Sequence, residues 1–218
     1  MKRPMKKQQL KLCLVTQVID ASAASLLVYK HFLRQAIAGG VTMVQLRIKQ
    51  QLTPEIIHFS RQVREVLALE HIPLIINDHV MLAQTLQAEG IHLGQSDMPP
   101  WVARQQLGPD KIIGLSIETT EQLLLANELS CIDYVGASAI FPSKTKTDCK
   151  TIWGLEGLEQ IVKLSRHPVV AIGGIDGQNA GEVMKRGASG IAVVSALHDA
   201  LDPKLAAQQL RDSCEGKI

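Results

Sequence analysis

Residues 73–100 read PLIINDHVMLAQTLQAEGIHLGQSDMPP, and this stretch contains the pattern that decides the fold. The apolar run PLIIN (73–77) has the length of one strand, VMLAQTLQAEG (80–90) is typical of a helix, and GIHLG (90–94) is again strand-like. Apolar runs that are continuous rather than alternating indicate strands covered on both faces, as in parallel sheets. The stretch therefore predicts a strand, a helix and a second strand parallel to the first.

The same alternation continues on both sides of this stretch. Further strand-length runs lie at 10–16, 41–47, 111–116, 132–138, 168–174 and 189–195, and further helix-like segments lie at 25–40, 53–70, 99–108, 119–130, 154–165, 177–188 and 202–213. Thr53 followed by Pro54 is a strong helix start, and the pair Gly39–Gly40 suits a helix end. Eight strands and eight helices at about 27 residues per unit predict an α/β fold, a single-domain (β/α)8 TIM barrel. A doubly wound open sheet is the alternative that the pattern leaves open.

The composition is that of an ordinary globular domain. Of the 218 residues, 46% are hydrophobic and 20% are charged, which excludes disordered, collagenous and coiled-coil chains. Aromatic residues make up only 3%, so the core must be aliphatic, and few rings are available to stack on single-stranded nucleic acid. The net charge of +2 is too small for a surface that coats a polyanion, so we expect no nucleic-acid partner.

The beginning of the chain carries the main local excess of charge, in MKRPMKKQQLK (1–11). We expect a basic N-terminal tail over 1–9 and the barrel domain over 10–218. The apolar run LCLV (12–15) is too short for a signal sequence, and no run approaches the roughly 18 apolar residues of a membrane span. The cysteines are scattered without CxxC spacing, which favours reduced thiols in a cytoplasmic protein: Cys13, Cys131, Cys149 and Cys214. The sequence leaves a homo-oligomer open.

Cationic side chains gather where the strand at 41–47 ends. Gln45, Arg47 and Lys49 follow one another at every second position, so they point to the same side of an extended chain. Two cations placed in this way suit a phosphate or a pyrophosphate, and the carboxyl ends of barrel strands are where chemistry takes place. The alternative is a pair of solvent-exposed basic residues without a ligand.

Acidic side chains follow the next two predicted strands. Asp78 comes after the strand at 73–77, and Asp97 follows the strand at 90–94. Together they could hold Mg²⁺, which commonly takes one or two protein carboxylates together with phosphate oxygens of a substrate. Taken singly, Asn77–Asp78 suits a turn and Asp97 suits a helix N-cap. The pairing of the two carboxylates is what favours a metal site.

The remaining strand ends are also polar or rich in glycine. Ser116 ends one strand, and the long loop 138–150 contains FPSKTKTD, which suits an anion clamp, a lid or a solvated loop. Gly173–Gly174 and Val194–Ser195 end the last two strands, where backbone N–H groups often bind phosphate, although a tight turn also explains the glycines. HExxH, Walker A and GxSxG motifs are missing, so zinc-hydrolase, P-loop and serine-hydrolase chemistry is unsupported.

Taken together, these segments resemble the thiamine-phosphate synthase family over roughly residues 10–197. The matching stretches are VTMVQLRIK (41–49), IINDHVMLAQTLQAEGIHLGQSDMP (75–99), IIGLS (112–116), DYVGASAIFPSKTKTD (133–148), GLEGL (154–158), VVAIGGI (169–175) and GASGIAVVSAL (187–197). The resemblance implies a transferase that couples 4-amino-5-hydroxymethyl-2-methylpyrimidine diphosphate with a thiazole phosphate carboxylate. The implied products are thiamine phosphate, pyrophosphate and CO2, formed by a dissociative displacement.

The resemblance also implies roles for individual residues. Those implied at the pyrimidine diphosphate are Arg47, Ile48, Lys49, Gln50, Gln51, Asn77, Ser116 and Lys146, and Gln45 is a further substrate-binding residue. Those implied at the thiazole phosphate are Ser143, Lys144, Thr145, Gly174, Val194 and Ser195. Catalysis is assigned to Arg47, Lys49, Ser116 and Lys146, and one Mg²⁺ per active site to Asp78 and Asp97. No side chain need act as a nucleophile or as a general base.

The chain departs from the usual family pattern at several positions. Ile48 stands where the family usually has Glu, and His79 stands where it usually has Arg; Ser96 and Glu118 also differ. The charged ligands are kept, but the changed surroundings of the diphosphate leave a reduced rate or an altered substrate preference open. Two alternatives are a thiazole tautomerase-like isomerase and a non-catalytic sensor of phosphate ligands on the same barrel. The retained charged residues favour the synthase, and Ile48 and His79 alone support the sensor.

Overall fold

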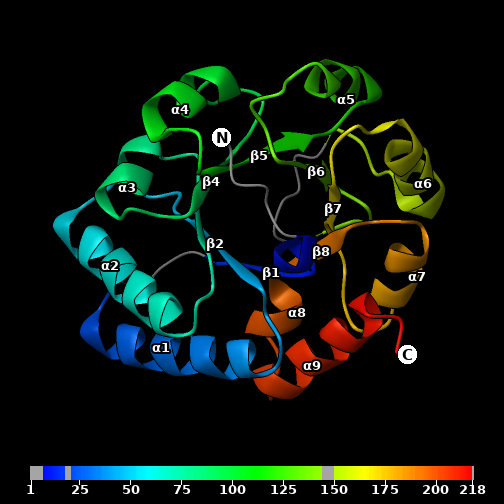
Figure 1. Cartoon of the computed structure of the whole chain (residues 1–218). Coiled ribbons are helices and arrows are strands. Elements are labelled where there is room, and N and C mark those ends of the chain that lie inside the picture. Colours follow the sequence, from blue (N-terminus) through cyan, green and yellow to red (C-terminus); the bar gives the residue numbers. More distant parts are fainter. Residues whose placement is uncertain (1–6, 18–20, 144–149, 218) are drawn as a thin grey trace.

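The computed structural model describes residues 7–17, 21–143 and 150–217. Within them, each strand pairs in parallel with the next, and the last pairs with the first to close a barrel (Figure 1). The strands are β1 (Leu12–Val15), β2 (Met43–Arg47), β3 (Leu74–Asn77), β4 (Gly90–Leu93), β5 (Ile112–Ile117), β6 (Tyr134–Ser138), β7 (Val169–Ile172) and β8 (Gly190–Val193). The predicted (β/α)8 barrel is confirmed, and closure by the β8–β1 pair excludes the open sheet.

The helices form a ring around this barrel, and α1 and α9 lie side by side in it (Figure 1). They are α1 (Ala23–Ala38), α2 (Pro54–Leu69), α3 (Val80–Thr85), α4 (Pro100–Leu107), α5 (Thr120–Asn127), α6 (Gly154–Leu164), α7 (Ala180–Lys185), α8 (Ser195–His198) and α9 (Pro203–Cys214). None of these described helices is long and apolar enough to cross a membrane. The short helix α8 was not predicted, because four residues are too few to show helical periodicity.

The predicted helix boundaries can be checked at their caps. Thr53 is the N-cap of α2, and its hydroxyl accepts a hydrogen bond from the Ile56 N–H, as predicted. Gly39 caps the end of α1, again as predicted. The N-cap interpretation of Asp97 is wrong, because Pro99 occupies that position before α4. Most of the predicted tail 1–9 lies outside the described residues; from residue 7 the chain forms a short 3-10 helix, Lys7–Leu10.

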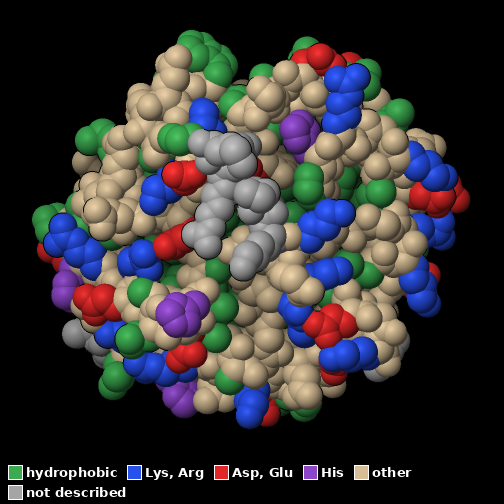
Figure 2. Space-filling model, viewed as in Figure 1, with side chains coloured by type: hydrophobic (Ala, Val, Ile, Leu, Met, Phe, Trp, Pro, Cys, Tyr) green, Lys and Arg blue, Asp and Glu red, His purple; other side chains and the backbone are tan. Residues whose placement is uncertain are grey.

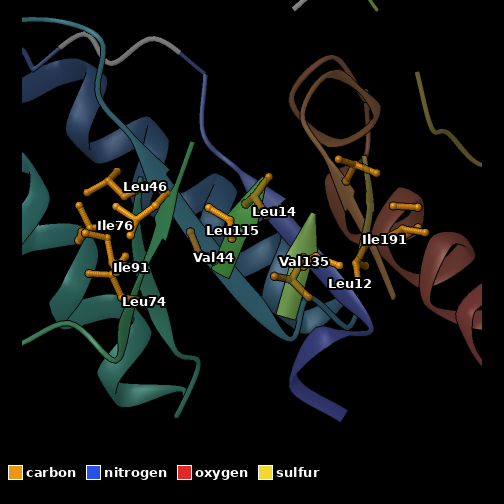
Figure 3. Close-up of a cluster of buried hydrophobic side chains, with 14 of the residues drawn as sticks. Leu12, Leu14, Val44, Leu46, Leu74, Ile76, Ile91, Leu115, Val135 and Ile191 are labelled. Atoms are coloured by element: carbon orange, nitrogen blue, oxygen red, sulfur yellow. The ribbon is translucent and has the colours of Figure 1, made fainter. Parts of the chain in front are cut away.

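Two layers of apolar side chains explain why the strands are apolar throughout. Side chains on the outer faces of the strands pack against the helices, as Leu12, Leu14, Val44 and Leu46 do in Figure 3. The side chains that alternate with them fill the barrel interior: Cys13, Val15, Met43, Ile75, Tyr134, Val170 and Ala192. Both faces of the sheet are therefore buried, and the core is mainly aliphatic, as the composition predicted.

Candidate active site

A cavity of about 240 Å³ opens among the loops that follow the strands and reaches down into the barrel interior. All eight strands contribute side chains or backbone to its wall. Eleven of the predicted site residues line this one cavity: Gln45, Arg47, Lys49, Asn77, Asp78, Asp97, Ser116, Ser143, Gly174, Val194 and Ser195. Lys144, Thr145 and Lys146 lie outside the described residues.

The end of β2 presents its polar residues to the cavity as the period of two predicted. Gln45, Arg47 and Lys49 all line the wall. The buried Thr16 hydroxyl accepts a hydrogen bond from the Arg47 N–H at 2.9 Å, which fixes the backbone where the guanidinium begins. Ile48 alternates to the other side, where its side chain is 2% exposed in the aliphatic core. A direct contact of the Ile48 side chain with substrate is therefore not supported.

The two glutamines after β2 are also absent from the cavity lining among the described residues. Gln50 and Gln51 follow Lys49, where the chain turns toward α2. The Ile48 carbonyl lies 3.3 Å from Nε2 of His79, and the same nitrogen lies 3.4 Å from an Asp78 carboxylate oxygen. Ile48 and His79 are thus in contact with one another, beside the acidic residue of the β3 end.

The carboxylates of Asp78 and Asp97 share one electrostatic environment. The Asp78 N–H donates to the His92 carbonyl at 2.9 Å, which holds the end of β3 against β4. Burial is the main cause that raises the pKa of the Asp78 carboxyl, and the negative charge of Asp97 raises it further. His79, Arg47 and Lys49 act in the opposite direction. These charges are therefore close enough to influence one another at one side of the cavity.

The Asp97 side chain also closes the turn after β4. Its Oδ2 accepts a hydrogen bond from the Gly94 N–H at 2.5 Å, in place of the helix cap expected from the sequence. Among the described residues, no group of three or more His, Cys, Asp or Glu side chains could hold a metal ion. Two carboxylates without a third protein ligand fit Mg²⁺, which usually retains water or takes substrate phosphate oxygens as its other ligands.

Glycines line the opposite side of the cavity, after β7. Gly173 and Gly174 have φ values of 104° and 62°, in the left-handed region that favours glycine. A Cβ on Gly174 would lie 2.6 Å from the Pro142 carbonyl oxygen, so this position also allows a close approach of the backbone. The Phe141 N–H donates to the Gly173 carbonyl at 3.0 Å, which ties the start of the β6–α6 loop to β7. Gly173, Gly174 and Ser143 all line this part of the cavity.

Comparisons with known proteins agree with one another on the family. The family model described as thiamine monophosphate synthase matches residues 12–197. Thiamine-phosphate synthase of Vibrio campbellii is 47% identical over 83% of this chain and 88% of its own, and that of Chlamydia caviae is 44% identical over 95% and 96%. The chain belongs to the thiamine-phosphate synthase family.

Solved structures agree with this assignment. Thiamine phosphate pyrophosphorylase from Pyrococcus furiosus superposes with a TM-score of 0.83 at 36% identity, covering 97% of this chain and 98% of the other. Orotidine 5'-phosphate decarboxylase from Pyrococcus horikoshii superposes with a TM-score of 0.67 at 14% identity, which shows a shared fold alone.

Figure 2 shows acidic and basic side chains close to one another around the barrel axis of this synthase-family chain.

Two polar residues in the wall of the cavity were not predicted from the sequence. His92 on β4 and Tyr134 on β6 both line it, although they are only 7% and 1% exposed. The rings are hydrogen-bonded through His92 Nδ1 and the Tyr134 hydroxyl at 2.9 Å. The available signal was a histidine inside the apolar run GIHLG, but its partner lies 42 residues further along the chain.

Proposed function

We propose that this cavity is the active site of a thiamine-phosphate synthase. The enzyme would couple the pyrimidine diphosphate with the thiazole phosphate carboxylate and release pyrophosphate and CO2 by dissociative displacement. The observation that carries the proposal is that two cations and two carboxylates, Arg47, Lys49, Asp78 and Asp97, line the mouth of one cavity in a chain of this family. Breaking the carbon–oxygen bond of the diphosphate requires that the negative charge of the departing pyrophosphate be stabilised.

The residues of β2 would perform most of that stabilisation. Arg47 and Lys49 both line the cavity on one side of the strand end, so their cationic groups can stabilise charge that develops on the pyrophosphate. Lys146 would add a third cation from the β6–α6 loop. One Mg²⁺ held by Asp78 and Asp97 would neutralise further charge on the diphosphate. No protein nucleophile is required, because the second substrate traps the carbocation that forms.

The thiazole phosphate would bind on the side of β6, β7 and β8. Ser143, Gly174, Val194 and Ser195 line the cavity there, and Lys144 and Thr145 belong to the same loop as Ser143. The two substrates would then face one another across the barrel axis, which converts a meeting of two molecules into a reaction within one complex. The remaining polar wall, Gln45, Asn77 and Ser116, would orient the heterocycle of the diphosphate substrate.

The test is a two-substrate assay with purified protein, with and without Mg²⁺, in which thiamine phosphate and pyrophosphate are both measured. We expect both products in equal amounts, and only when Mg²⁺ is present. Acceleration of thiazole isomerisation without thiamine phosphate would contradict the synthase and support the tautomerase-like isomerase. Binding of the pyrimidine diphosphate without any turnover would instead support the non-catalytic sensor, an alternative suggested by Ile48 and His79.

We also propose a cytoplasmic location, in line with the free thiols of Cys13, Cys131 and Cys214.

A further inference from the structure

A chain of neutral polar side chains crosses the inner wall of the cavity, below the charged mouth. Asn77 Nδ2 donates to Gln45 Oε1 at 2.8 Å, and the Gln45 side chain interacts with the Tyr134 hydroxyl, which acts to lower the Tyr134 pKa. The Tyr134 hydroxyl lies 2.9 Å from His92 Nδ1, and His92 Nε2 lies 2.8 Å from Ser116 Oγ. This series of hydrogen bonds begins at Asn77 and ends at Ser116, both proposed to bind substrate, but His92 and Tyr134 have no assigned role.

One set of donor and acceptor roles satisfies every member of this hydrogen-bond series, starting from Gln45. Gln45 Oε1 accepts from Asn77, and the amide NH2 of Gln45 is then available to donate to the Tyr134 hydroxyl, with which the Gln45 side chain interacts. Burial raises the pKa of that hydroxyl well above its usual range, so it keeps its proton and can donate it to His92 Nδ1. With this donor at Nδ1, the imidazole proton would reside on Nε2 and be donated to Ser116 Oγ, 2.8 Å away.

Two glycines make room for this arrangement. Gly114 pairs with His92 on one side and with Tyr134 on the other, and a Cβ at Gly114 would overlap the tyrosine ring and lie 2.5 Å from His92 Nδ1. A Cβ on Gly136 would lie 3.1 Å from His92 Cε1. Glycine weakens a strand, so its use at two inward positions beside these rings indicates that their placement matters. The hydrogen bonds are also largely shielded from water, which strengthens them.

We propose that His92 is a positioning residue that fixes the Ser116 hydroxyl as a hydrogen-bond donor toward an acceptor atom of the bound substrate. When Ser116 Oγ accepts the proton of His92 Nε2, its own hydrogen can be donated to an acceptor in the cavity that Ser116 lines. No proton is transferred; the imidazole stays neutral and holds its hydrogen on Nε2. This inference rests on the proposed function, because it assumes that substrate occupies the cavity.

The tautomer of His92 can be measured without any turnover. ¹⁵N NMR of the full chain labelled in its histidines reports which ring nitrogen carries the proton, and the His92 signals are those lost in His92→Gln. We expect neutral imidazole with the proton on Nε2 at neutral pH, and loss of this single tautomer in Tyr134→Phe, which keeps the ring and removes the hydroxyl. A proton on Nδ1 in the wild-type chain, or an imidazolium, would overturn the inference.

A matched pair of variants tests the consequence for catalysis. The amide nitrogen of Gln reaches about as far as Nε2 of histidine and can donate to Ser116, whereas Asn ends near the position of Nδ1. We expect His92→Asn to lower kcat about tenfold with a smaller change in KM, and His92→Gln to restore most of that loss. Equal activities in the two variants, or activities that follow Tm alone, would show a purely structural role. A wild-type chain without synthase activity but with the expected tautomer would contradict the proposed function instead.

Discussion

The two ends of the barrel use charged residues in opposite ways. At the amino end, Arg104 donates hydrogen bonds to four backbone carbonyl groups and also pairs with Asp133 at 2.8 Å. At the carboxyl end, Asp78 and Asp97 face one cavity, and burial, together with the negative charge of Asp97, raises the pKa of the Asp78 carboxyl. Charges at one end are thus matched to the fold, and charges at the other end are those we propose to bind the ligand.

The acids at the amino end illustrate what such matching achieves. Asp133, just before β6, accepts from the Ile113 N–H on β5 at 2.8 Å as well as from Arg104. Glu89, just before β4, likewise accepts from the Leu74 N–H on β3 at 2.9 Å and pairs with Arg64. Each acid therefore ties the start of one strand to the neighbouring strand. We expect substitutions here to change stability and substitutions at the carboxyl end to change activity.

The largest effect on stability is expected for Arg104→Met. This change leaves the Asp133 carboxylate, whose side chain is only 8% exposed, without its cation and removes the donors of several carbonyl groups. Breaking a buried pair in this way costs about 3–5 kcal/mol of the free energy of unfolding. Urea unfolding monitored by circular dichroism measures the loss, and KM for both substrates should be unchanged.

The matched control is Arg166→Met, which removes an exposed ion pair with Glu128 that has a similar distance of 2.9 Å. We expect a change of at most about 0.5 kcal/mol there, because water and salt already screen the pair. Similar losses in the two variants would contradict the claim that burial gives the Arg104 pair its importance. A large rise in KM for Arg104→Met would contradict the separation of the two barrel ends.

The next largest effect is expected at the carboxyl end, for Asp97→Asn. Asparagine keeps an oxygen that can accept from the Gly94 N–H, so the turn after β4 is preserved, while the negative charge is removed. We expect Mg²⁺-dependent formation of thiamine phosphate to fall about a hundredfold, or about 2.7 kcal/mol in the activation barrier, with the unfolding free energy unchanged. The rate is measured over a titration of Mg²⁺, since a weakened metal site shifts the half-saturating concentration upward.

Asp97→Ala separates the two roles of this side chain. It removes both the charge and the acceptor for Gly94, so it should lose activity like Asp97→Asn and some stability as well. If Asp97→Asn were fully active and Asp97→Ala were not, the carboxylate would serve the turn rather than a metal ion. In that case the proposed difference between the two barrel ends would hold for Arg104 but not for Asp97.

The parts of this molecule that could be predicted are those encoded by local pattern. The period of two placed Gln45, Arg47 and Lys49 on one side of the β2 end. The alternation of strand-length apolar runs with helix-like segments predicted the barrel. The series of hydrogen bonds through His92 and Tyr134 could not be predicted, because the strand register that brings the two residues together exists only once β4, β5 and β6 are aligned. The cap assigned to Asp97 failed for a local reason, because the turn after β4 brings the Gly94 N–H to its carboxylate.

His198, near the carboxyl end of the barrel, contributes to stability and is therefore an exception to the division between a stabilising amino end and a functional carboxyl end. His198 in α8 stacks on Phe32 with ring centroids 4.6 Å apart and on Tyr29 at 6.0 Å. Burial lowers its pKa from 6.5 to about 4, while a hydrogen bond with the Val15 backbone and the nearby Asp199 raise it in part. The folded state therefore holds a neutral imidazole at pH values where the unfolded chain would be protonated.

The sign of the pH effect follows from this difference. As pH falls below 6.5 the unfolded chain binds a proton at His198 before the folded chain does, so the contribution to stability is complete above pH 6.5 and is lost toward pH 4. We expect the free energy of unfolding to fall by about 1–2 kcal/mol more in the wild-type chain than in His198→Gln between pH 7 and pH 4.5. Urea unfolding at both pH values measures this. Parallel pH dependences of the two chains would show that the fold does not lower the pKa of His198.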